Sequence, residues 1–542
     1  MTSFPKVRNH RPLIMGRRGA VAANHPVATQ AGLDILRAGG NAVDATLATA
    51  LALAVVEPHM SGLGGDGFYH VYDARTGQSR IYNGTGAAPQ AATVEYYRKV
   101  GRIPIDGPLS VSIPGLVAGL SMMHARQGTK TWEYCFGPAI DAARSGFAVT
   151  HTYRHFAAET QARLKADRTG TRIFLGEGGA PPAIGDIIVQ PELAATLEAI
   201  AKGGAEVFYH GPMAERIVKG LGQVGGLLTA ADLASCQAEE VMPVVATYRG
   251  YEVRQTPPNS MGFALLEELR IAECFNLAAM GWGSADLVHT LVEAKKLAFL
   301  DRERHAADPR AYTAPLDHLL APSHAASLAA KIDPLKAAYL PVSSSVAECD
   351  TTYFCVVDES GNAVSAIQSL NSAFGSGVMA GDTGILLNNR MAYWHLEDGH
   401  PNQLAPGKRV RHTMNAPVIL KGGKLWCVVG TPGADKQVQV NLQVLVGMID
   451  FDLDPQAAVE AARWASNQPG DEANYPHISE DSLILERGFG ESVIAELRRR
   501  GHKVKIVGDL EGPCSVEAIR VYSNGTRVAG SDPRRDGWAA AY

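Results

Sequence analysis

A β-hairpin pattern in the second half of the chain constrains the fold more than any other feature of the sequence. Residues 353–358 are rich in strand-forming side chains, 359–362 (Glu-Ser-Gly-Asn) have turn composition, and 363–368 return as a second strand. The hairpin follows residues 306–350, which are irregular and rich in Ala, Pro and Ser and so indicate an exposed, weakly structured connector. The chain therefore passes from an exposed connector directly into a buried strand.

Helical patterns dominate residues 115–300, whereas strands and helices alternate after the hairpin. Tight turns between successive strands indicate antiparallel pairing, and the mixture predicts an α+β layered fold. Further strands are expected at 68–73, 418–420, 425–429 and 516–522, and further helices at 28–56 (two, separated by Gly39-Gly40), 193–202, 265–275, 434–449 and 491–500.

The composition is that of a folded protein with a large core. Of 542 residues, 46% are hydrophobic and 19% are charged, which excludes a disordered or fibrous chain. The net charge of -5 gives no electrostatic reason to expect nucleic acid or a membrane as partner. The longest apolar run, 45–56, is too short for a bilayer span of about 20 residues. Because no signal segment is recognisable and the seven cysteines are scattered, we expect a cytoplasmic protein without disulfides.

Two motifs suggest cofactors or metals, and neither has the context that such sites need. Residues 62–67 have the glycine spacing of a dinucleotide-binding motif, but that motif lies between a strand and a helix. Here Pro58 precedes the glycines and a strand pattern follows them, so we interpret the segment as a tight structural loop. His151 and His155 have helical spacing but no evident third ligand. We therefore expect no cofactor and no metal site.

Thr351 lies where the connector enters the hairpin, and this position allows a specific chemistry. A hydroxyl at the start of such a strand can attack the preceding carbonyl, that of Asp350, and hydrolysis of the resulting ester frees the α-amine of Thr351. An α-amine has a pKa near ~8 and lies beside its own hydroxyl, so it can act as the general base. The pattern alone also fits simple β-propensity, because threonine pairs are common at strand starts.

Eight short motifs are distributed along the whole chain, and their order and spacing are informative. They are Gly39-Gly-Asn-Ala-Val-Asp44, Gly62-Leu-Gly-Gly-Asp-Gly-Phe68, Pro114-Gly-Leu-Val-Ala-Gly119, Tyr248-Arg-Gly-Tyr251, Asp350-Thr-Thr352, Gly384-Ile-Leu-Leu-Asn-Asn389, Gly430-Thr-Pro-Gly433 and Ser531-Asp-Pro-Arg534. In these motifs the chain resembles the gamma-glutamyltransferase family of N-terminal nucleophile hydrolases. The resemblance implies a four-layer αββα sandwich formed by two associated segments of one precursor, a large subunit (1–350) and a small subunit (351–542).

The resemblance also implies roles for residues around the reaction centre. Thr351 matches the family's nucleophile, and Ser369 and Asn371 match residues that surround the nucleophile and the substrate. Gly433 and Ala434 match the two glycines whose backbone N–H groups form the oxyanion hole. Alanine retains the amide, so this role survives the substitution.

Departures from the family pattern concern the substrate pocket. Thr85 stands where the gamma-glutamyl enzymes carry an Arg for the α-carboxylate, and Tyr393 stands where they carry an Asp for the α-amino group. Each charge-assisted contact is worth about 1.5–3 kcal/mol, so we expect poor recognition of a gamma-glutamyl head group. His412 and Thr413 occupy the positions of two serines near the substrate. Arg390 replaces a Gln, which indicates either an acidic substrate group or an arginine paired within the protein.

The sequence therefore predicts a threonine amidohydrolase or acyltransferase that matures by autoproteolysis. Its expected partners are a small-molecule amide and water or an amine as acceptor, and a homo-oligomer is compatible with the sequence. Cephalosporin acylases and oxamate amidohydrolase are among the relatives that the resemblance brings in. Two alternatives stay open: a true gamma-glutamyltransferase or glutathione hydrolase, and an uncleaved, non-catalytic paralogue acting as a binding module. The hydroxyl of Thr351 argues against the second, because a binding module has no need of it.

Overall fold

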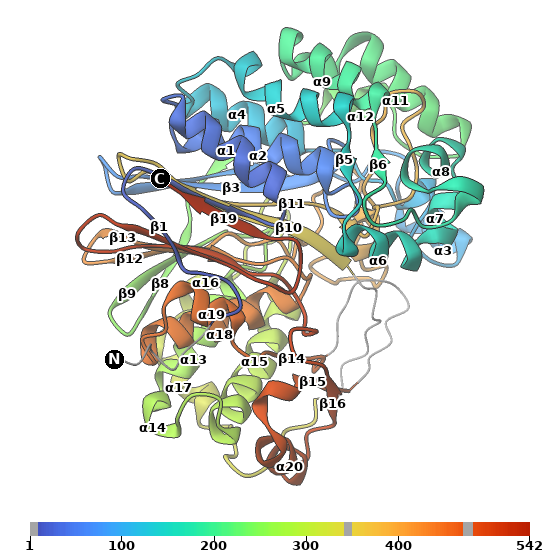
Figure 1. The fold of residues 1–542 in the computed structure, drawn as a ribbon. Coiled ribbons are helices and arrows are strands. Elements are labelled where there is room, and N and C mark those ends of the chain that lie inside the picture. Colours follow the sequence, from blue (N-terminus) through green and yellow to red (C-terminus); the bar gives the residue numbers. More distant parts are fainter. Residues whose placement is uncertain (1–8, 341–348, 470–480) are drawn as a thin grey trace.

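The computed structural model describes residues 9–340, 349–469 and 481–542, and its centre is a pair of seven-stranded antiparallel sheets (Figure 1). We name each sheet after one of its strands. In spatial order, the β10 sheet contains β19 (Trp538–Ala541), β2 (Ala20–Ala23), β10 (Cys349–Val357), β11 (Ala363–Ser372), β3 (Asp66–Asp73), β4 (Gln78–Gly84) and β7 (Glu239–Val241). The β13 sheet contains β1 (Ile14–Gly16), β18 (Arg527–Ser531), β17 (Glu517–Val521), β13 (Lys424–Gly430), β12 (Val418–Lys421), β9 (Tyr251–Gln255) and β8 (Val244–Tyr248).

The two sheets pack face to face, and helices cover their outer faces (Figure 1). Alternate side chains of both sheets meet in a fully buried core, for example Phe68 and Ile367 of one sheet and Val428 and Ile519 of the other. This four-layer αββα arrangement confirms the predicted fold. The β10 sheet is covered by α1 (Pro26–Arg37), α2 (Ala42–Val56), α4 (Leu116–Gln127) and α5 (Trp132–Ser145), and the β13 sheet by α13 (Phe263–Glu273), α15 (Ala285–His305), α18 (Lys436–Asp450) and α19 (Pro455–Glu460).

Helix α2 shows why an apolar run of this length does not signal a membrane span. Every residue from 42 to 56 is buried, because the helix packs between α1, α5 and strands β10 and β11. Asn41 caps its start by accepting hydrogen bonds from the amides of Val43 and Asp44, as the Gly39-Gly40 break predicts. No helix in the described ranges is long and apolar enough to cross a bilayer.

The predicted hairpin is confirmed as β10 and β11, but the prediction for the preceding connector is partly wrong. Two short helices, α16 (Leu316–Leu319) and α17 (Pro322–Ala329), form within it. Pro322 suits the first turn of α17, and the buried Ala325 and Leu328 pack on the apolar side of the helical layer. Residues 341–348 of the connector lie outside the described residues.

Smaller elements complete the fold. A third sheet consists of β14 (Trp464–Ser466), β15 (Leu483–Glu486) and β16 (Val504–Val507). The other helices named in Figure 1 are α3 (Val94–Val100), α6 (His151–Glu159), α7 (Gln161–Lys165), α8 (Arg168–Phe174), α9 (Pro191–Gly203), α11 (Gly211–Gln223), α12 (Ala230–Ala234), α14 (Leu277–Met280) and α20 (Glu491–Arg499).

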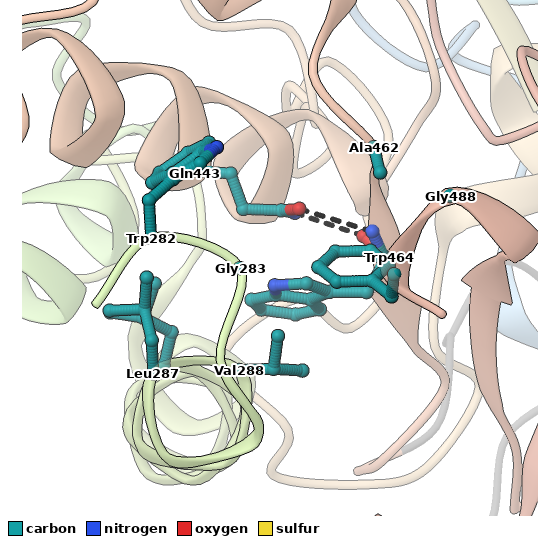
Figure 2. A pocket seen from close by; sticks show the side chains of 10 residues that line it. Trp282, Gly283, Leu287, Val288, Gln443, Ala462, Trp464 and Gly488 are labelled. Carbon is teal, nitrogen blue, oxygen red and sulfur yellow. Dashed lines mark hydrogen bonds between the residues drawn. The ribbon is translucent and has the colours of Figure 1, made fainter. Parts of the chain in front are cut away.

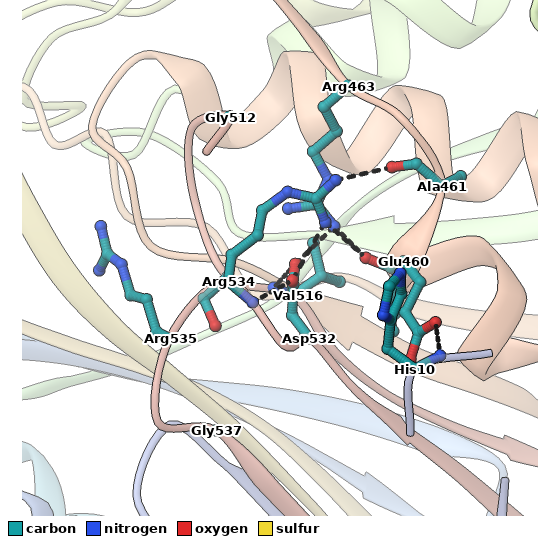
Figure 3. A network of polar contacts seen from close by, with 12 residues as sticks. His10, Glu460, Ala461, Arg463, Gly512, Val516, Asp532, Arg534, Arg535 and Gly537 are labelled. Carbon is teal, nitrogen blue, oxygen red and sulfur yellow. Dashed lines mark hydrogen bonds and ion pairs between the residues drawn. The ribbon is translucent and has the colours of Figure 1, made fainter. Parts of the chain in front are cut away.

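A buried network of charges joins the end of β18 to the neighbouring loops (Figure 3). Arg463 Nη2 lies 2.5 Å from Asp532 Oδ2, and Arg534 bonds both Asp532, at 3.1 Å, and Glu486, at 2.6 Å. Burial acts to raise the pKa of Asp532, but the two guanidinium groups keep it below its ordinary value. The Ser531–Arg534 motif therefore has a structural role: it fixes the loop that carries Arg535.

Candidate active site

Thr351 lies in β10 at a point where the pairing with β11 is irregular. The register runs from Asp350 opposite Asn371 to Thr352 opposite Gln368, so two residues of β11 face Thr351 alone. Such a β-bulge interrupts the ladder and redirects side chains, and bulges are common beside active sites. The predicted scissile bond is therefore at an irregular position of an otherwise regular strand.

Two residues of β11 surround the hydroxyl of Thr351. Thr351 Oγ1 donates to Ser369 Oγ over 3.3 Å, and Ser369 Oγ also accepts from the backbone amide of Asn371 over 2.7 Å. Asn371 has a φ of +89°, a left-handed conformation that Asn tolerates better than most residues. The turn in the chain at Asn371 directs β11 toward the loop that contains Arg390.

A line of contacts continues from Asn371 to three charged or titratable side chains. Arg390 Nη1 donates to Asn371 Oδ1 over 3.0 Å, and Arg390 Nε lies 3.6 Å from Asp66 Oδ2. His412 Nε2 lies 3.7 Å from the same oxygen. These side chains are at most 1% exposed, yet Arg390 Nη2 and both ring nitrogens of His412 make no hydrogen bond within the described ranges. Such buried polar groups require an explanation, and a bound substrate is one.

Burial shifts the pKa values of two side chains in this cluster, Asp66 and His412. Burial raises the pKa of Asp66 to about 6, although Arg390 and the amides of Gly86 and Gly115 oppose the rise. Burial, reinforced by Arg390, lowers the pKa of His412 well below its ordinary value, so the imidazole is neutral at pH 7. The cluster therefore has one permanent charge, that of Arg390, and one carboxyl group that titrates within a biologically relevant range.

Thr85 and Tyr393 lie beside this cluster, and neither offers a charged contact. Thr85 Oγ1 donates to Asn83 Oδ1 over 2.6 Å and accepts from Asn259 Nδ2 over 3.2 Å. The Tyr393 ring has the guanidinium carbons of Arg390 and Arg411 at 5.5 and 5.3 Å from its centroid, an arrangement typical of cation–π contacts.

Thr413 and His412 follow a segment that packs against the Asn259 loop. The backbone amide of His412 donates to Asn259 O over 2.8 Å, and Thr413 O accepts from Asn415 Nδ2 over 3.1 Å. Both residues are buried. The structure thus brings Ser369, Asn371, Arg390 and His412 together with Thr351 and places Thr85 and Tyr393 at the edge of the same cluster.

Gly433 and Ala434 precede helix α18 and face a cavity of about 760 Å³ that Ser372 also lines. Their φ angles of +119° and +51° are both in the left-handed region. No oxygen of the described residues accepts a hydrogen bond from either amide. Because a helix N-terminus favours negative charge, two free amides here can stabilise an oxyanion.

Strand β10, which contains Thr351, is connected to the loop of Gly433 and Ala434 by side chains that the sequence analysis did not identify. Asn24 Nδ2 donates to Thr352 Oγ1 over 3.3 Å, and Ser515 Oγ donates to Asn24 Oδ1 over 2.8 Å. The Ser515 amide in turn donates to Thr431 Oγ1 over 3.1 Å. This path fixes the loop relative to β10.

Basic side chains predominate around the cavity. Its titratable lining residues are His155, Glu159, Arg163, Lys436, Lys505, Glu511 and Arg535. A surface of this kind favours anionic ligands.

Asp66 is the site residue that sequence reasoning missed. The prediction that 62–67 form a tight loop is confirmed for residues 62–65, where a Cβ on Gly65 would overlap the carbonyl of Ser369, whereas Asp66 and Gly67 already belong to strand β3. The signal that could have identified Asp66 is a lone acidic side chain among glycines next to a buried strand. The side chain of Asp350, in contrast, lies outside the described residues.

A second cavity, of about 310 Å³, contains none of the candidate catalytic residues (Figure 2). It lies between α15, α18 and β14 and is lined by Trp282, Trp464 and neighbouring apolar side chains. The amide of Gln443 is fully engaged there, donating to Trp464 O over 2.9 Å and accepting from Trp464 N over 3.1 Å. Its apolar lining offers no group for acyl transfer.

Two antiparallel sheets between helical layers, with the candidate nucleophile near the start of a central strand, define an N-terminal nucleophile hydrolase. Residues 28–542 match the family model described as gamma-glutamyltranspeptidase, and the chain belongs to this enzyme family, which confirms the predicted resemblance.

Similar proteins share nearly the full length of the chain. The glutathione hydrolase-like YwrD proenzyme of Bacillus subtilis is 38% identical over 97% of this chain and 99% of its own. The oxamate amidohydrolase proenzyme of Klebsiella pneumoniae is 35% identical over 97% and 98%. The crystal structure of cephalosporin acylase from Bacillus halodurans superposes with a TM-score of 0.90 at 33% identity, covering 100% of this chain and 99% of the other.

Substitutions at Gly433 and Ala434 test whether their backbone amides stabilise an oxyanion. In Gly433→Ala the added Cβ would overlap Cys514 Sγ, and a φ of +119° suits only glycine, so the amide must move. We expect kcat to fall at least about 100-fold, the usual loss when one oxyanion donor is removed. Ala434→Gly keeps its amide and relaxes a φ of +51°, so kcat should remain close to that of the wild type. Steady-state kinetics at matched amounts of folded, cleaved protein measures both, and equal kcat values would contradict the assignment.

The raised pKa of Asp66 predicts a pH dependence of stability. Between 3.8 and about 6, folded protein holds a proton on Asp66 that the unfolded chain has released. The free energy of unfolding contributed by Asp66 therefore falls as pH rises through this window, by about 3 kcal/mol for about two pKa units. Unfolding midpoints of the wild type and Asp66→Asn from pH 4 to 7 measure the effect, and the wild type should lose stability relative to the variant. A difference that is constant with pH would contradict the prediction.

Proposed function

We propose that this protein is a threonine amidohydrolase or acyltransferase that cleaves itself between Asp350 and Thr351 and then acts on amides with an acidic acyl group. One observation supports an acidic acyl group in the substrate: Arg390 Nη2 is buried and makes no hydrogen bond within the described ranges. A guanidinium donor of this kind is a preferred partner for a carboxylate.

Maturation is the rearrangement of one peptide bond. Thr351 Oγ1 attacks the carbonyl carbon of Asp350, the C–N bond breaks, and the hydroxyl proton passes to the released amine, so an ester replaces the amide. Water then hydrolyses the ester, which leaves a carboxylate on Asp350 and a free hydroxyl and α-amine on Thr351. The β-bulge at this position supports the proposal, because the strand ladder is interrupted where the bond must distort.

Catalysis then uses the same hydroxyl on the substrate. The α-amine of Thr351 takes the hydroxyl proton, Oγ1 attacks the amide carbon, and the free amides of Gly433 and Ala434 stabilise the oxyanion. Collapse of the intermediate breaks the C–N bond, and the leaving amine receives the proton. Water or an amine acceptor releases the acyl group from Thr351.

The pocket is better suited to a carboxylate than to a gamma-glutamyl head group, which also carries an ammonium group. Thr85 is held by two asparagine side chains, and Tyr393 already faces two guanidinium groups, so neither forms an ion pair with such a head group. The Klebsiella relative is named for oxamate, the monoamide of a dicarboxylic acid. The short path of contacts from Thr351 through Asn371 to Arg390 favours a short acyl chain of this type.

Replacing the nucleophile tests maturation and distinguishes an enzyme from an uncleaved binding module. Wild-type protein should give fragments of about 37 and about 20 kDa on a denaturing gel, from 57.6 kDa scaled by 350/542 and 192/542. Thr351→Ala should remain a single band of 57.6 kDa without amidase activity, because no hydroxyl can attack Asp350. Thr351→Ser is the matched control, since it keeps a hydroxyl and should still cleave. Cleavage of Thr351→Ala after residue 350 would refute the assignment of the nucleophile.

Three p-nitroanilides test the acyl pocket. We expect kcat/KM to be higher for glutaryl-p-nitroanilide than for gamma-glutamyl-p-nitroanilide, because the glutaryl group lacks the ammonium. Valeryl-p-nitroanilide, which has a similar chain without a carboxylate, should also be a poor substrate. In Arg390→Gln, kcat/KM for the glutaryl donor should fall about 10- to 150-fold, the equivalent of about 1.5–3 kcal/mol, whereas the valeryl donor should be little affected.

The same substrates also test the alternative function, that of a true gamma-glutamyltransferase. A tenfold preference for gamma-glutamyl over glutaryl, about 1.4 kcal/mol, would mean that the protein is an ordinary gamma-glutamyltransferase. Equal losses for glutaryl and valeryl donors in Arg390→Gln would mean that Arg390 supports the structure of the pocket and does not bind the substrate.

A further inference from the structure

Three helices of the layer that covers the β13 sheet bring together a second group of polar side chains. Glu267 comes from α13, Asp301 from α15 and His324 from α17. None of these residues belongs to the candidate active site. They are separated widely in sequence, so only the packing of the helices brings them together.

The distances within this cluster are those between neighbouring ligands of one metal ion. His324 Nε2 lies 2.9 Å from Asp301 Oδ2 and 3.4 Å from Glu267 Oε1, and the three atoms all lie within 4.8 Å of one another. Two donors that are each about 2.1 Å from an ion are about 3.0–3.4 Å apart at angles between octahedral and tetrahedral. Only small side-chain shifts are needed to bind an ion.

Glu267 supplies an independent reason to expect a ligand. Its side chain is 0% exposed, and neither carboxylate oxygen accepts a hydrogen bond from any described residue. Its Oε1 nevertheless points to within 3.4 Å of His324 Nε2. A buried carboxylate without donors is costly, and either a proton or a cation must compensate for it.

Three other histidine–carboxylate clusters in the described part of the chain lack this feature. The Asp44 carboxylate accepts hydrogen bonds from backbone and side-chain donors, including Thr129. Glu293 accepts from Lys296 Nζ and from a backbone amide. Glu303 accepts from His400 Nε2 with one oxygen, and its other oxygen lies 3.5 Å from Arg302 Nη2. In those clusters the protein itself satisfies the carboxylate, so no ion is required.

The cluster is also accessible from solvent on one side. The His324 side chain is 14% exposed, and its ring lies 4.7 Å, centroid to centroid, from the exposed His318. The cluster therefore reaches the surface at the His324 ring. Imidazole and carboxylate donors together suit Zn²⁺ and similar divalent ions.

We propose that Glu267, Asp301 and His324 form a binding site for a divalent transition-metal ion, with Zn²⁺ as the best probe. The ion would cross-link α13, α15 and α17 and so stabilise this helical layer. Asp301 is adjacent to Arg302, which pairs with Asp435 at the start of α18 over 2.7 Å. The site therefore supports, from a distance, the loop that carries Gly433 and Ala434.

Metal binding to the full protein tests the proposal without reference to activity. After removal of metals with EDTA and dialysis, ZnCl₂ should bind in a 1:1 ratio by isothermal titration calorimetry. At free Zn²⁺ about 100-fold above Kd, the unfolding midpoint should rise by about 2 °C for a chain of this size. Glu267→Gln and His324→Gln should each bind Zn²⁺ at least about tenfold more weakly and lose this rise. His210→Gln removes an exposed histidine that pairs with Glu206, and it should bind like the wild type.

Each other outcome argues against the site. If the wild type binds no Zn²⁺ and its unfolding midpoint is unchanged, Glu267 is a protonated carboxyl group and the proposal fails. If Glu267→Gln binds Zn²⁺ as tightly as the wild type, the ion binds elsewhere. Circular dichroism of each metal-free variant shows whether the fold is retained. Should His324→Gln fail to fold, the neutral and nearly isosteric Glu267→Gln still decides the question.

Discussion

The position of β10 between β2 and β11 is the constraint on which the rest of the structure depends. Residues 354–357 pair with both neighbours, but β2 ends at Ala23, so Thr352 pairs only with β11 and Thr351 lies at the irregular position of that pairing. The apolar core between the sheets fixes this register, because a slip of one residue would move every inward-facing side chain of β10 to the opposite face of the sheet. The hydroxyl of Thr351 is thereby held at the open end of a rigid strand, next to Ser369 and Asn371.

A pocket built on such a rigid frame can keep charges that a core would otherwise exclude. Arg390 and Asp66 are almost fully buried and only 3.6 Å apart, and desolvation makes such pairs a poor source of stability. Their presence is consistent with the proposed recognition of an acidic acyl group, since a guanidinium donor is a preferred partner for a carboxylate.

Local patterns in the sequence predicted the fold well, whereas contacts between distant segments were missed. The hairpin, helix α2 and the strands β3, β12, β13 and β17 were predicted, because each has its own periodicity and turn signals. The other strands of the two sheets, β1, β2, β4, β7, β8, β9, β18 and β19, were not predicted. Helix α17 was missed, since a short alanine-rich segment has no periodicity to recognise. Asp66 and the Glu267 cluster depend on tertiary proximity, which no local pattern contains. The predicted roles of Thr351, Gly433 and Ala434 came from the family resemblance and stay predictions.

The electrostatics at the start of α18 link the helical layer over the β13 sheet to the candidate site. Asp435 occupies the N-cap position of this helix without a capping hydrogen bond from its side chain, and a carboxylate there would by itself oppose an oxyanion at the neighbouring amides. Arg302 of α15 and Arg411 both pair with Asp435, at 2.7 and 3.0 Å, and all three side chains are at most 2% exposed. Glu303 also lies 3.5 Å from Arg302, so charges of both signs are buried close to the start of α18. Because α15 supplies one of these arginines, the position of this helix contributes to the electrostatic environment of the residues that precede α18.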